Sequence, residues 1–345
     1  MKNVTTLLVL ILFTAGMTFA QNNQASVDQS GNDLGATVTQ TGESNDADVV
    51  QRDFGGSAHQ AVVTQSGFEN VAEVLSQGGT GANTVDLDQQ GNQNEATIAQ
   101  LWGRNAADVS QEGDENTVNL QHRGSYNSEA TITQVGSYNE AEIKDAGQTG
   151  SNPASGNTAV VSQDGVSNSA AIDVNHSSGN MSSITQYGSD NSASQWIAGD
   201  DNDLTQTQDG NNNSQRLEVT GDNNVLSANQ DGDGNRLYFN ARGTGPGANE
   251  SQLFNSDFTA DQTGNDNIIS GSMGGDNNSL TITQYGNDNQ VSAGQGLWDA
   301  AGFMIEGADN TASISQYDNG NSAVLNVQGD GNSATITQSG APAAL

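Results

Sequence analysis

The chain has 345 residues, a formal net charge of −33 and a hydrophobic content of 32%, well below that of an ordinary globular domain. It has no cysteine, which excludes a disulfide framework and thiol chemistry. With 41 acidic and only 8 basic residues it lacks a surface for neutralising phosphates, so we expect no nucleic-acid binding. Low hydrophobicity with high charge is typical of disorder unless a regular pattern is present.

The first twenty residues predict a secretory signal peptide. Lys2 supplies a basic start, Leu7–Phe13 is an uninterrupted apolar run, and the segment ends in the small residue Ala20. The apolar run is too short to span a bilayer. We therefore expect cleavage after Ala20, secretion and an extracellular location, with no later segment that crosses a membrane.

A tandem repeat occupies residues 21–340. Asn94–Gln100, Asn310–Gln316 and Asn332–Gln338 share the template N-x-A-x-[VI]-x-Q, which x-G-x-x separates from the next Asn, so the unit is 11 residues long. The Asn recurs at this spacing in long runs, of which one is Asn180, Asn191, Asn202, Asn213, Asn224 and Asn235. Because a disordered chain needs no such register, the repeat excludes disorder.

The alternation inside each unit predicts a β-strand of about seven residues, with Asn, Ala, Val or Ile and Gln on one face. The Gly two residues after the Gln predicts a turn. We expect an all-β fold: a β-solenoid with two units per 22-residue rung and two stacked parallel sheets, as in cross-β structure. Inward Asn and Gln side chains would stack as hydrogen-bonded ladders. The predicted ladder residues are Gln40, Asn45, Gln65, Asn70, Gln100, Asn105, Gln111, Asn116, Gln134, Asn139, Gln163, Asn168, Gln186, Asn191, Gln284, Asn289, Gln316, Asn321, Asn332 and Gln338.

Three segments break the 11-residue register and predict loops that leave the stack. They are residues 147–156, 243–248 and 294–307, and residues 341–345 form a short tail. Pro153, Pro246 and Pro342 lie in these segments, outside the strands where proline would remove a ladder donor. The third loop holds an apolar cluster, which predicts a packed cap or, alternatively, a partner site: Leu297, Trp298, Phe303 and Met304.

Catalysis finds no support in the sequence. His59, His122 and His176 do not have the spacing of metal ligands, and no G-x-S-x-G elbow is present. Turn formation and solvation account for the many acids. We predict that the protein is not an enzyme and needs no cofactor.

Two binding functions remain as alternatives. Asp231–Asn235 resembles the start of a calcium loop, but Arg236 follows where a glycine is needed and no Glu closes the loop, so nonspecific divalent cations at acidic turns are the expectation. An acidic β-roll or an adhesin would act as a binding protein. The other alternative is an ice-binding solenoid, suggested by Thr-x-Thr pairs that we expect not to recur on successive rungs of one face: Thr37/Thr39, Thr131/Thr133, Thr281/Thr283 and Thr335/Thr337.

The pattern Q-x-G-x-x-N-x-A-x-[VI]-x-Q resembles the curlin repeat of the curli subunits, which are bacterial functional amyloids. The resemblance extends from about Asn23 to Gly340. It implies export in an unfolded form through an outer-membrane secretion pore, and polymerisation with other copies of the chain on a nucleator subunit. The resulting extracellular fibres, akin to pili or fimbriae, would support cell adhesion and the biofilm matrix.

Overall fold

The structure is a computed structural model that describes residues 22–55, 58–78, 81–146, 156–241, 252–291 and 302–340. Within these ranges every regular secondary-structure element is a β-strand, which confirms the predicted fold class. No helix of the described residues is long and apolar enough to cross a membrane. The chain forms two compact units, one of residues 1–167 with 173–177 and the other of residues 168–172 with 178–345.

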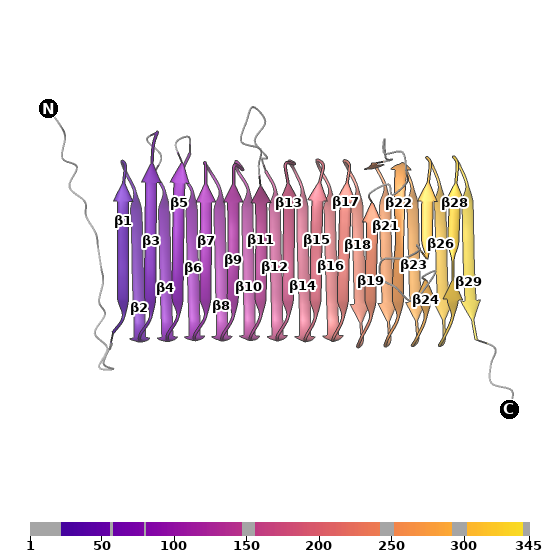
Figure 1. Ribbon diagram of the computed structural model, residues 1–345, viewed down its shortest axis with the longest axis horizontal. Helices are drawn as coiled ribbons and strands as arrows, with labels where there is room; N and C mark the ends of the chain where they lie inside the picture. The colour runs from indigo at the N-terminus through magenta and orange to yellow at the C-terminus, as the bar shows by residue number, and fades with distance from the viewer. Residues whose placement is uncertain are drawn as a thin grey trace. The chain divides into compact units, whose positions relative to one another are not determined.

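The first unit contains two parallel sheets, which we name sheet A and sheet B (Figure 1). In both, each strand pairs with the next strand but one of the chain. Sheet A holds β1 (Gln24–Ser30), β3 (Asp46–Asp53), β5 (Val71–Gly78), β7 (Glu95–Leu101), β9 (Thr117–Arg123) and β11 (Glu140–Ala146). Sheet B holds β2 (Gly35–Glu43), β4 (Gln60–Phe68), β6 (Thr84–Asn92), β8 (Ala106–Asp114), β10 (Glu129–Ser137) and β12 (Thr158–Val166).

The second unit repeats this arrangement, with strands of the two sheets again alternating along the chain. The first part of β13 (Ser169–Asn175) belongs to this unit and the last part to the first unit. Its sheet A holds β15 (Ser192–Ala198), β17 (Ser214–Thr220), β19 (Arg236–Ala241), β20 (Leu253–Phe254), β22 (Ile268–Asp276), β24 (Gln290–Val291), β25 (Phe303–Glu306), β27 (Ser322–Ala323) and β28 (Leu325–Gln328). Its sheet B holds β14 (Met181–Ser189), β16 (Asp203–Asn211), β18 (Val225–Asp231), β21 (Asp257–Thr263), β23 (Ser279–Tyr285), β26 (Thr311–Tyr317) and β29 (Ser333–Ser339).

Paired strands are parallel and keep equivalent repeat positions opposite each other. Val27 pairs with Val49 and Met181 with Asp203, each 22 residues apart, as predicted for a rung of two units. Where extra residues intervene the offset grows but the register holds, as between Ile132 and Val161. A 22-residue rung therefore places each type of side chain above its own kind.

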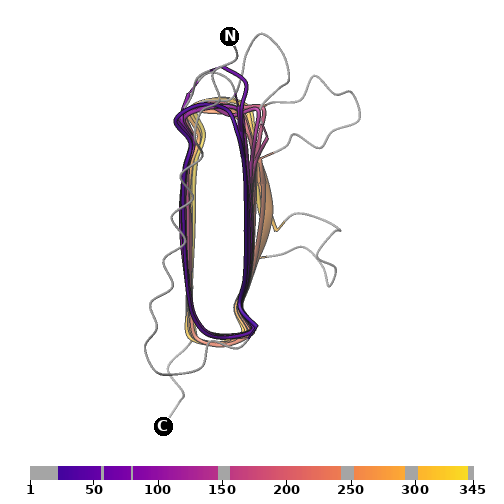
Figure 2. The same ribbon diagram turned by 90° about the vertical axis from the view of Figure 1, so that its left-hand side faces the viewer.

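The core of each unit lies between its two sheets. In β10, Ala130, Ile132 and Gln134 are buried, whereas Thr131 and Thr133 alternate with them and are partly exposed. Figure 2 shows, for the strands of each unit, two facing layers joined by turns at their ends. The core thus contains one layer of apolar side chains bounded by layers of Asn and Gln.

The turn after each strand of sheet B brings the backbones of successive rungs into close contact. Gly113 has a φ of +117°, and a Cβ atom there would collide with the carbonyl oxygen of Gly136 in the next rung. The same holds for Gly67 and Gly91. Glycine is required here both by the dihedral angle and by the lack of space.

The prediction that residues 294–307 form a loop is wrong for the C-terminal part of this segment. Phe303–Glu306 form strand β25, which pairs with β22 and β28. The buried Phe303 ring stacks against Phe239 and Phe258, with centroids 6.1 and 5.8 Å apart. Gly271, opposite Phe303 in β22, makes this possible because any side chain there would collide with the ring. Leu297 and Trp298 lie outside the described residues, as do 243–248 and all of 147–156 except Gly156.

Replacing Gly113 with Ala should lower the stability by about 1–3 kcal/mol, the usual cost of overpacking, because the new methyl group meets main-chain atoms that cannot move aside. Gly320→Ala is the control, since Gly320 also has a positive φ but nothing within 4 Å of its Cβ position. Urea unfolding followed by circular dichroism compares the midpoints. Equal losses for the two variants would show that backbone strain, and not the contact between rungs, requires the glycine.

Candidate functional site

A continuous glutamine ladder runs through sheet B of the first unit. Gln40 donates from Nε2 to Oε1 of Gln65 at 2.8 Å, and Gln65 donates to Gln89 at 2.9 Å. The same Nε2 of Gln65 donates to the main-chain oxygen of Asp46 in sheet A at 3.0 Å. Each glutamine therefore joins its own sheet to the facing sheet as well as to the next rung. The ladder continues through Gln111, Gln134 and Gln163.

The second unit has the same ladder along its sheet B. It begins at Gln186, which donates to Gln208 at 2.8 Å, and ends where Gln316 donates to Gln338 at 2.8 Å. The members between them are Gln208, Gln230, Gln262, Gln284 and Gln316. Four members of the two ladders were not among the predicted residues, although each has the Q-x-G spacing that would have found it: Gln89, Gln208, Gln230 and Gln262.

An asparagine column precedes the strands of sheet A in each unit. The main-chain N–H of Asn70 donates to Oδ1 of Asn45 at 3.1 Å, and Nδ2 of Asn70 donates to the Gly91 carbonyl at 2.8 Å. These bonds satisfy side chains that are wholly buried. The predicted residues in this column are Asn45, Asn70, Asn116, Asn139, Asn168, Asn191, Asn289 and Asn321.

Asn105 and Asn332 belong to a different column, which precedes the strands of sheet B. Asn332 N–H donates to Oδ1 of Asn310 at 3.0 Å, and Asn105 N–H to Asn83 at 3.1 Å. Ser128 and Ser256 interrupt this second column. The asparagines therefore form two separate stacks, one at each end of the strands.

Gln100 was wrongly assigned to a ladder of identical side chains. It lies in sheet A, where its in-register neighbours are Ser76 and His122. Its Nε2 donates to the Thr84 carbonyl at 3.1 Å, but its buried Oε1 has no partner. Sheet A has one such Gln–Gln bond near the N-terminal end, from Gln29 to Gln51 at 2.7 Å.

His122 and Asp145 continue this irregular column, paired with each other in register and both buried. Burial lowers the pKa of His122 to about 4. Burial raises the pKa of Asp145, partly opposed by hydrogen bonds with Ser128, Asn157 and Ser125. Both side chains replace the glutamine of the regular repeat. The buried polar atoms of this column therefore have fewer hydrogen-bond partners than those of the ladder in sheet B.

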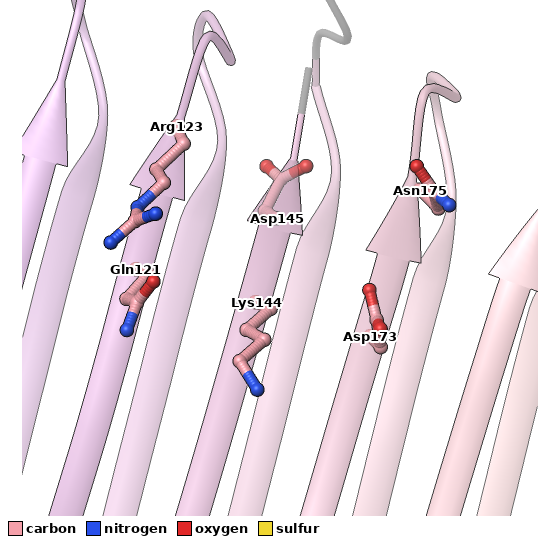
Figure 3. Close-up of a pocket in the computed structure, with 6 residues that line it drawn as sticks. All are labelled: Gln121, Arg123, Lys144, Asp145, Asp173 and Asn175. Carbon is pink, nitrogen blue, oxygen red and sulfur yellow. The ribbon is translucent and has the colours of Figure 1, made fainter. Parts of the chain in front are cut away.

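A cavity of about 280 Å³ lies beside Asp145 on the outer side of sheet A (Figure 3). Lys144 lies next to Asp145 in the sequence and pairs with Glu142 at 2.7 Å. The residues that line the cavity include both acidic and basic side chains: Gln121, Arg123, Lys144, Asp145, Asp173 and Asn175. The described residues contain no group of three or more His, Asp or Glu side chains that could hold a metal ion.

The acidic turn at Asp231–Asn235 takes part in a stack of its own. Oδ1 of Asp233 accepts a hydrogen bond from the Asn211 N–H at 2.8 Å, and the Asp233 N–H donates to Asn265 at 2.9 Å. One carboxylate oxygen of the suggested calcium loop is therefore engaged with the neighbouring turn.

The Thr-x-Thr pairs all occur in strands of sheet B, in β2 and β10 of the first unit and in β23 and β29 of the second. No two pairs lie on successive strands, since β4, β6 and β8 separate the first two and β26 separates the last two. The expectation that the pairs do not recur on successive rungs is therefore confirmed. In the second unit, Ser or Thr fills most of these positions in the strands between the pairs.

Acidification should destabilise the fold through His122. The pKa of this side chain is about 4 when folded and 6.5 in its ordinary state, so the stability that its neutral form contributes is complete above 6.5 and falls as the pH drops toward 4. Each pH unit in this window costs up to about 1.4 kcal/mol. Denaturant midpoints measured from pH 7 to 4 should decline less in His122→Gln, which restores the residue of the repeat. An identical decline in this variant would assign the effect to other groups.

The curlin associated repeat family matches four stretches of the chain, residues 20–52, 82–121, 155–194 and 307–340. No sequence among curated proteins matches the chain. The matched stretches contain Gln40, Gln111, Gln163 and Gln186, each followed by the glycine and asparagine that build the turns and columns described above. The chain thus contains curlin associated repeats in these four stretches.

Proposed function

We propose that this protein is a secreted structural subunit that assembles head to tail into extracellular curli-like amyloid fibres, which serve cell adhesion and the biofilm matrix. The family is one of structural fibre subunits, and the observation that carries the proposal is the pair of open end rungs. Each end rung contributes one strand to each sheet, and among the described residues it has one neighbouring rung.

The end rungs are less covered than the interior ones. Val27 and Ala25 in β1 are half-buried, whereas Val49 and Ala47, their partners in β3, are fully buried. At the other end, Ile336 in β29 is half-buried, whereas its partner Ile314 is fully buried. Exposed apolar groups and unpaired strand edges favour the addition of another chain.

The two ends also match in hydrogen-bonding direction. Every ladder bond runs from Nε2 of one glutamine to Oε1 of the next toward the C terminus. Among the described residues, Gln40 is the first of the ladder, so no preceding glutamine donates to its Oε1, and Gln338 is the last, so it donates to no following glutamine. Stacking β2 of one copy on β29 of another lets Gln338 donate to Gln40. Equivalent ends that do not close on themselves give open filaments.

Secretion and export belong to the same proposal. Residues 1–20 would be removed as a signal peptide, although they lie outside the described residues. The family resemblance supports passage through an outer-membrane pore and nucleation by a second subunit. Self-association is the central interaction, and the ladder residues of the end rungs act in it.

Purified mature chain should form fibres that are visible by electron microscopy, with a reflection at about 4.7–4.8 Å along the fibre axis. Gln338→Ala should lengthen the lag time, because it removes the donor at the C-terminal end. Thr335→Ala, an outward change in the same strand, should leave the lag nearly unchanged. Soluble monomers at high concentration without this reflection would refute the assembly, and equal lags would refute the role of the ladder.

Assembly should be slow at neutral pH and low salt, because a chain of charge −33 repels an arriving copy. Asp86 and Asp108 are in-register neighbours, and burial together with the charges of Asp108 and Asp88 raises the pKa of Asp86. Salt of about 0.1 M shortens the screening length to about 10 Å. The lag time of dye-monitored assembly should therefore fall with added salt, and with pH lowered from 7 toward the carboxylate pKa values. A lag that lengthens with salt would contradict control by repulsion.

A further inference from the structure

The two units differ at one inward position of sheet A. We name it the sixth position, because in a regular repeat it lies six residues after the asparagine that precedes the strand, as Gln29 follows Asn23. From β1 to β11 the residues at this position are polar: Gln29, Gln51, Ser76, Gln100, His122 and Asp145. In the second unit they are apolar and buried: Ile197, Val219, Ala241, Met273, Ile305 and Val327.

The end rungs are stepped, because each rung begins in sheet A and ends in sheet B. At the N-terminal end, Val27 in β1 is half-buried, whereas Val38 in β2 is only 5% exposed. At the C-terminal end the order of the sheets is reversed, since Ile336 in β29 is half-buried and Leu325 in β28 is only 6% exposed. The outermost strand therefore belongs to sheet A at one end and to sheet B at the other. A second copy can thus place its β1 beside β27 and β28, and its β2 beside β29.

The register of the stack fixes which side chains meet in such a joint. Continued into a second copy, it places Val27 opposite Leu325 and Gln29 opposite Val327, since each pair occupies equivalent repeat positions. The first pair continues the apolar core. The second pair brings a side-chain amide against a side chain that can neither donate nor accept a hydrogen bond.

Gln29 brings one unused acceptor to this joint. Its Nε2 donates to Oε1 of Gln51 at 2.7 Å, and among the described residues no group donates to its own Oε1. Gln29 is half-buried, so in the free chain this oxygen is open to solvent. In the joint Val327 would cover the oxygen without offering a donor, and a buried acceptor without a donor is costly.

We propose, on the basis of the fibre assembly inferred above, that the joint between two copies is matched in sheet B and mismatched in sheet A, and that Val327 limits its strength. In sheet B, Gln338 supplies the donor that Gln40 lacks. In sheet A, the apolar end of one copy meets the polar start of the next, because the sixth position changes in character between the two units. Val327 is therefore the residue that determines how well the sheet A half of the joint fits.

A glutamine at position 327 would restore the match. Its Nε2 would face Oε1 of Gln29, as each ladder glutamine faces the next one toward the C terminus. The oxygen of the new amide would have the apolar Ile305 as its in-register neighbour in the free chain and in the fibre alike. The cost of that oxygen therefore cancels in the assembly equilibrium, and the new bond to Gln29 remains.

The first test compares Val327→Gln with Val324→Gln. Val324 lies in the same rung but is 57% exposed, so the same substitution there leaves the sixth position unchanged. The concentration of soluble chain that remains when assembly reaches its plateau measures the strength of the joint. Val327→Gln should lower this concentration roughly tenfold, the equivalent of one restored buried hydrogen bond, and Val324→Gln should leave it unchanged. Equal concentrations for wild type and Val327→Gln would overturn the mismatch.

A second pair of variants changes only the N-terminal rung and covers the case in which Val327→Gln does not fold. Gln29→Glu and Gln40→Glu each place a carboxylate at a half-buried site, and each lose the bond to the glutamine of the next rung. In the joint Gln338 donates to a carboxylate at position 40, whereas Val327 offers no donor to one at position 29. At pH 7 the remaining soluble concentration should rise several-fold more in Gln29→Glu than in Gln40→Glu. An equal rise, or the reverse order, would overturn the assignment.

The failure of this inference differs from the failure of the proposed function. Fibres that respond equally to both members of each pair would leave fibre assembly intact and refute the mismatch. If the wild type forms no fibres at any concentration, the proposed function fails. Fibres from Val327→Gln alone would then show that the mismatch prevents assembly, and no fibres from either chain would refute both.

Discussion

The whole structure depends on the hydrogen bond that one buried glutamine amide donates to the next. A buried amide without hydrogen-bond partners is costly. Most of the buried glutamine side chains in this chain have their partners in a ladder. The Nε2 group of Gln65 shows how the ladder works, since it reaches Gln89 in the next rung and Asp46 in the facing sheet. The same group therefore sets the register between rungs and the distance between sheets. Because each bond needs an identical residue one rung away, the repeat in the sequence is a direct requirement of the structure.

The two sheets of the first unit are not equivalent, although they derive from the same repeat. Sheet B has an unbroken ladder, whereas the corresponding column of sheet A changes from Gln51 to Ser76 and later to His122 and Asp145. Several buried polar atoms of this column lack partners, including Oε1 of Gln100 and Nδ1 of His122. Local stability in a stacked repeat depends on nearest neighbours, so these rungs should open before those around the ladder of sheet B.

Negative charge and the proposed self-association can coexist because the acids occupy particular places. Asp233 is exposed, and a hydrogen bond from Asn211 ties it to the stack of turns. Asp86 and Asp108 lie on the outer face of sheet B in the first unit, away from the edges that elongate the stack. In the proposed fibre, solubility of the monomer and growth along the stack thus involve different parts of the surface.

The sequence by itself determined the strands, their inward and outward faces, the 22-residue rung and most of the ladder. Local spacing contains this information, since alternation fixes the face of each side chain and Q-x-G-x-x-N fixes each turn. The tertiary structure decided what depends on which repeats become neighbours. The sequence predicts Gln100 as a ladder residue, but in the structure its in-register neighbours are Ser76 and His122. The sequence predicts that Phe303 lies in a loop, but in the structure it lies in a strand, because Gly271 in the adjacent strand leaves room for its ring. The Thr-x-Thr pairs are scattered along the chain, and only the alternation of repeats between two sheets places the pairs of each unit in its sheet B.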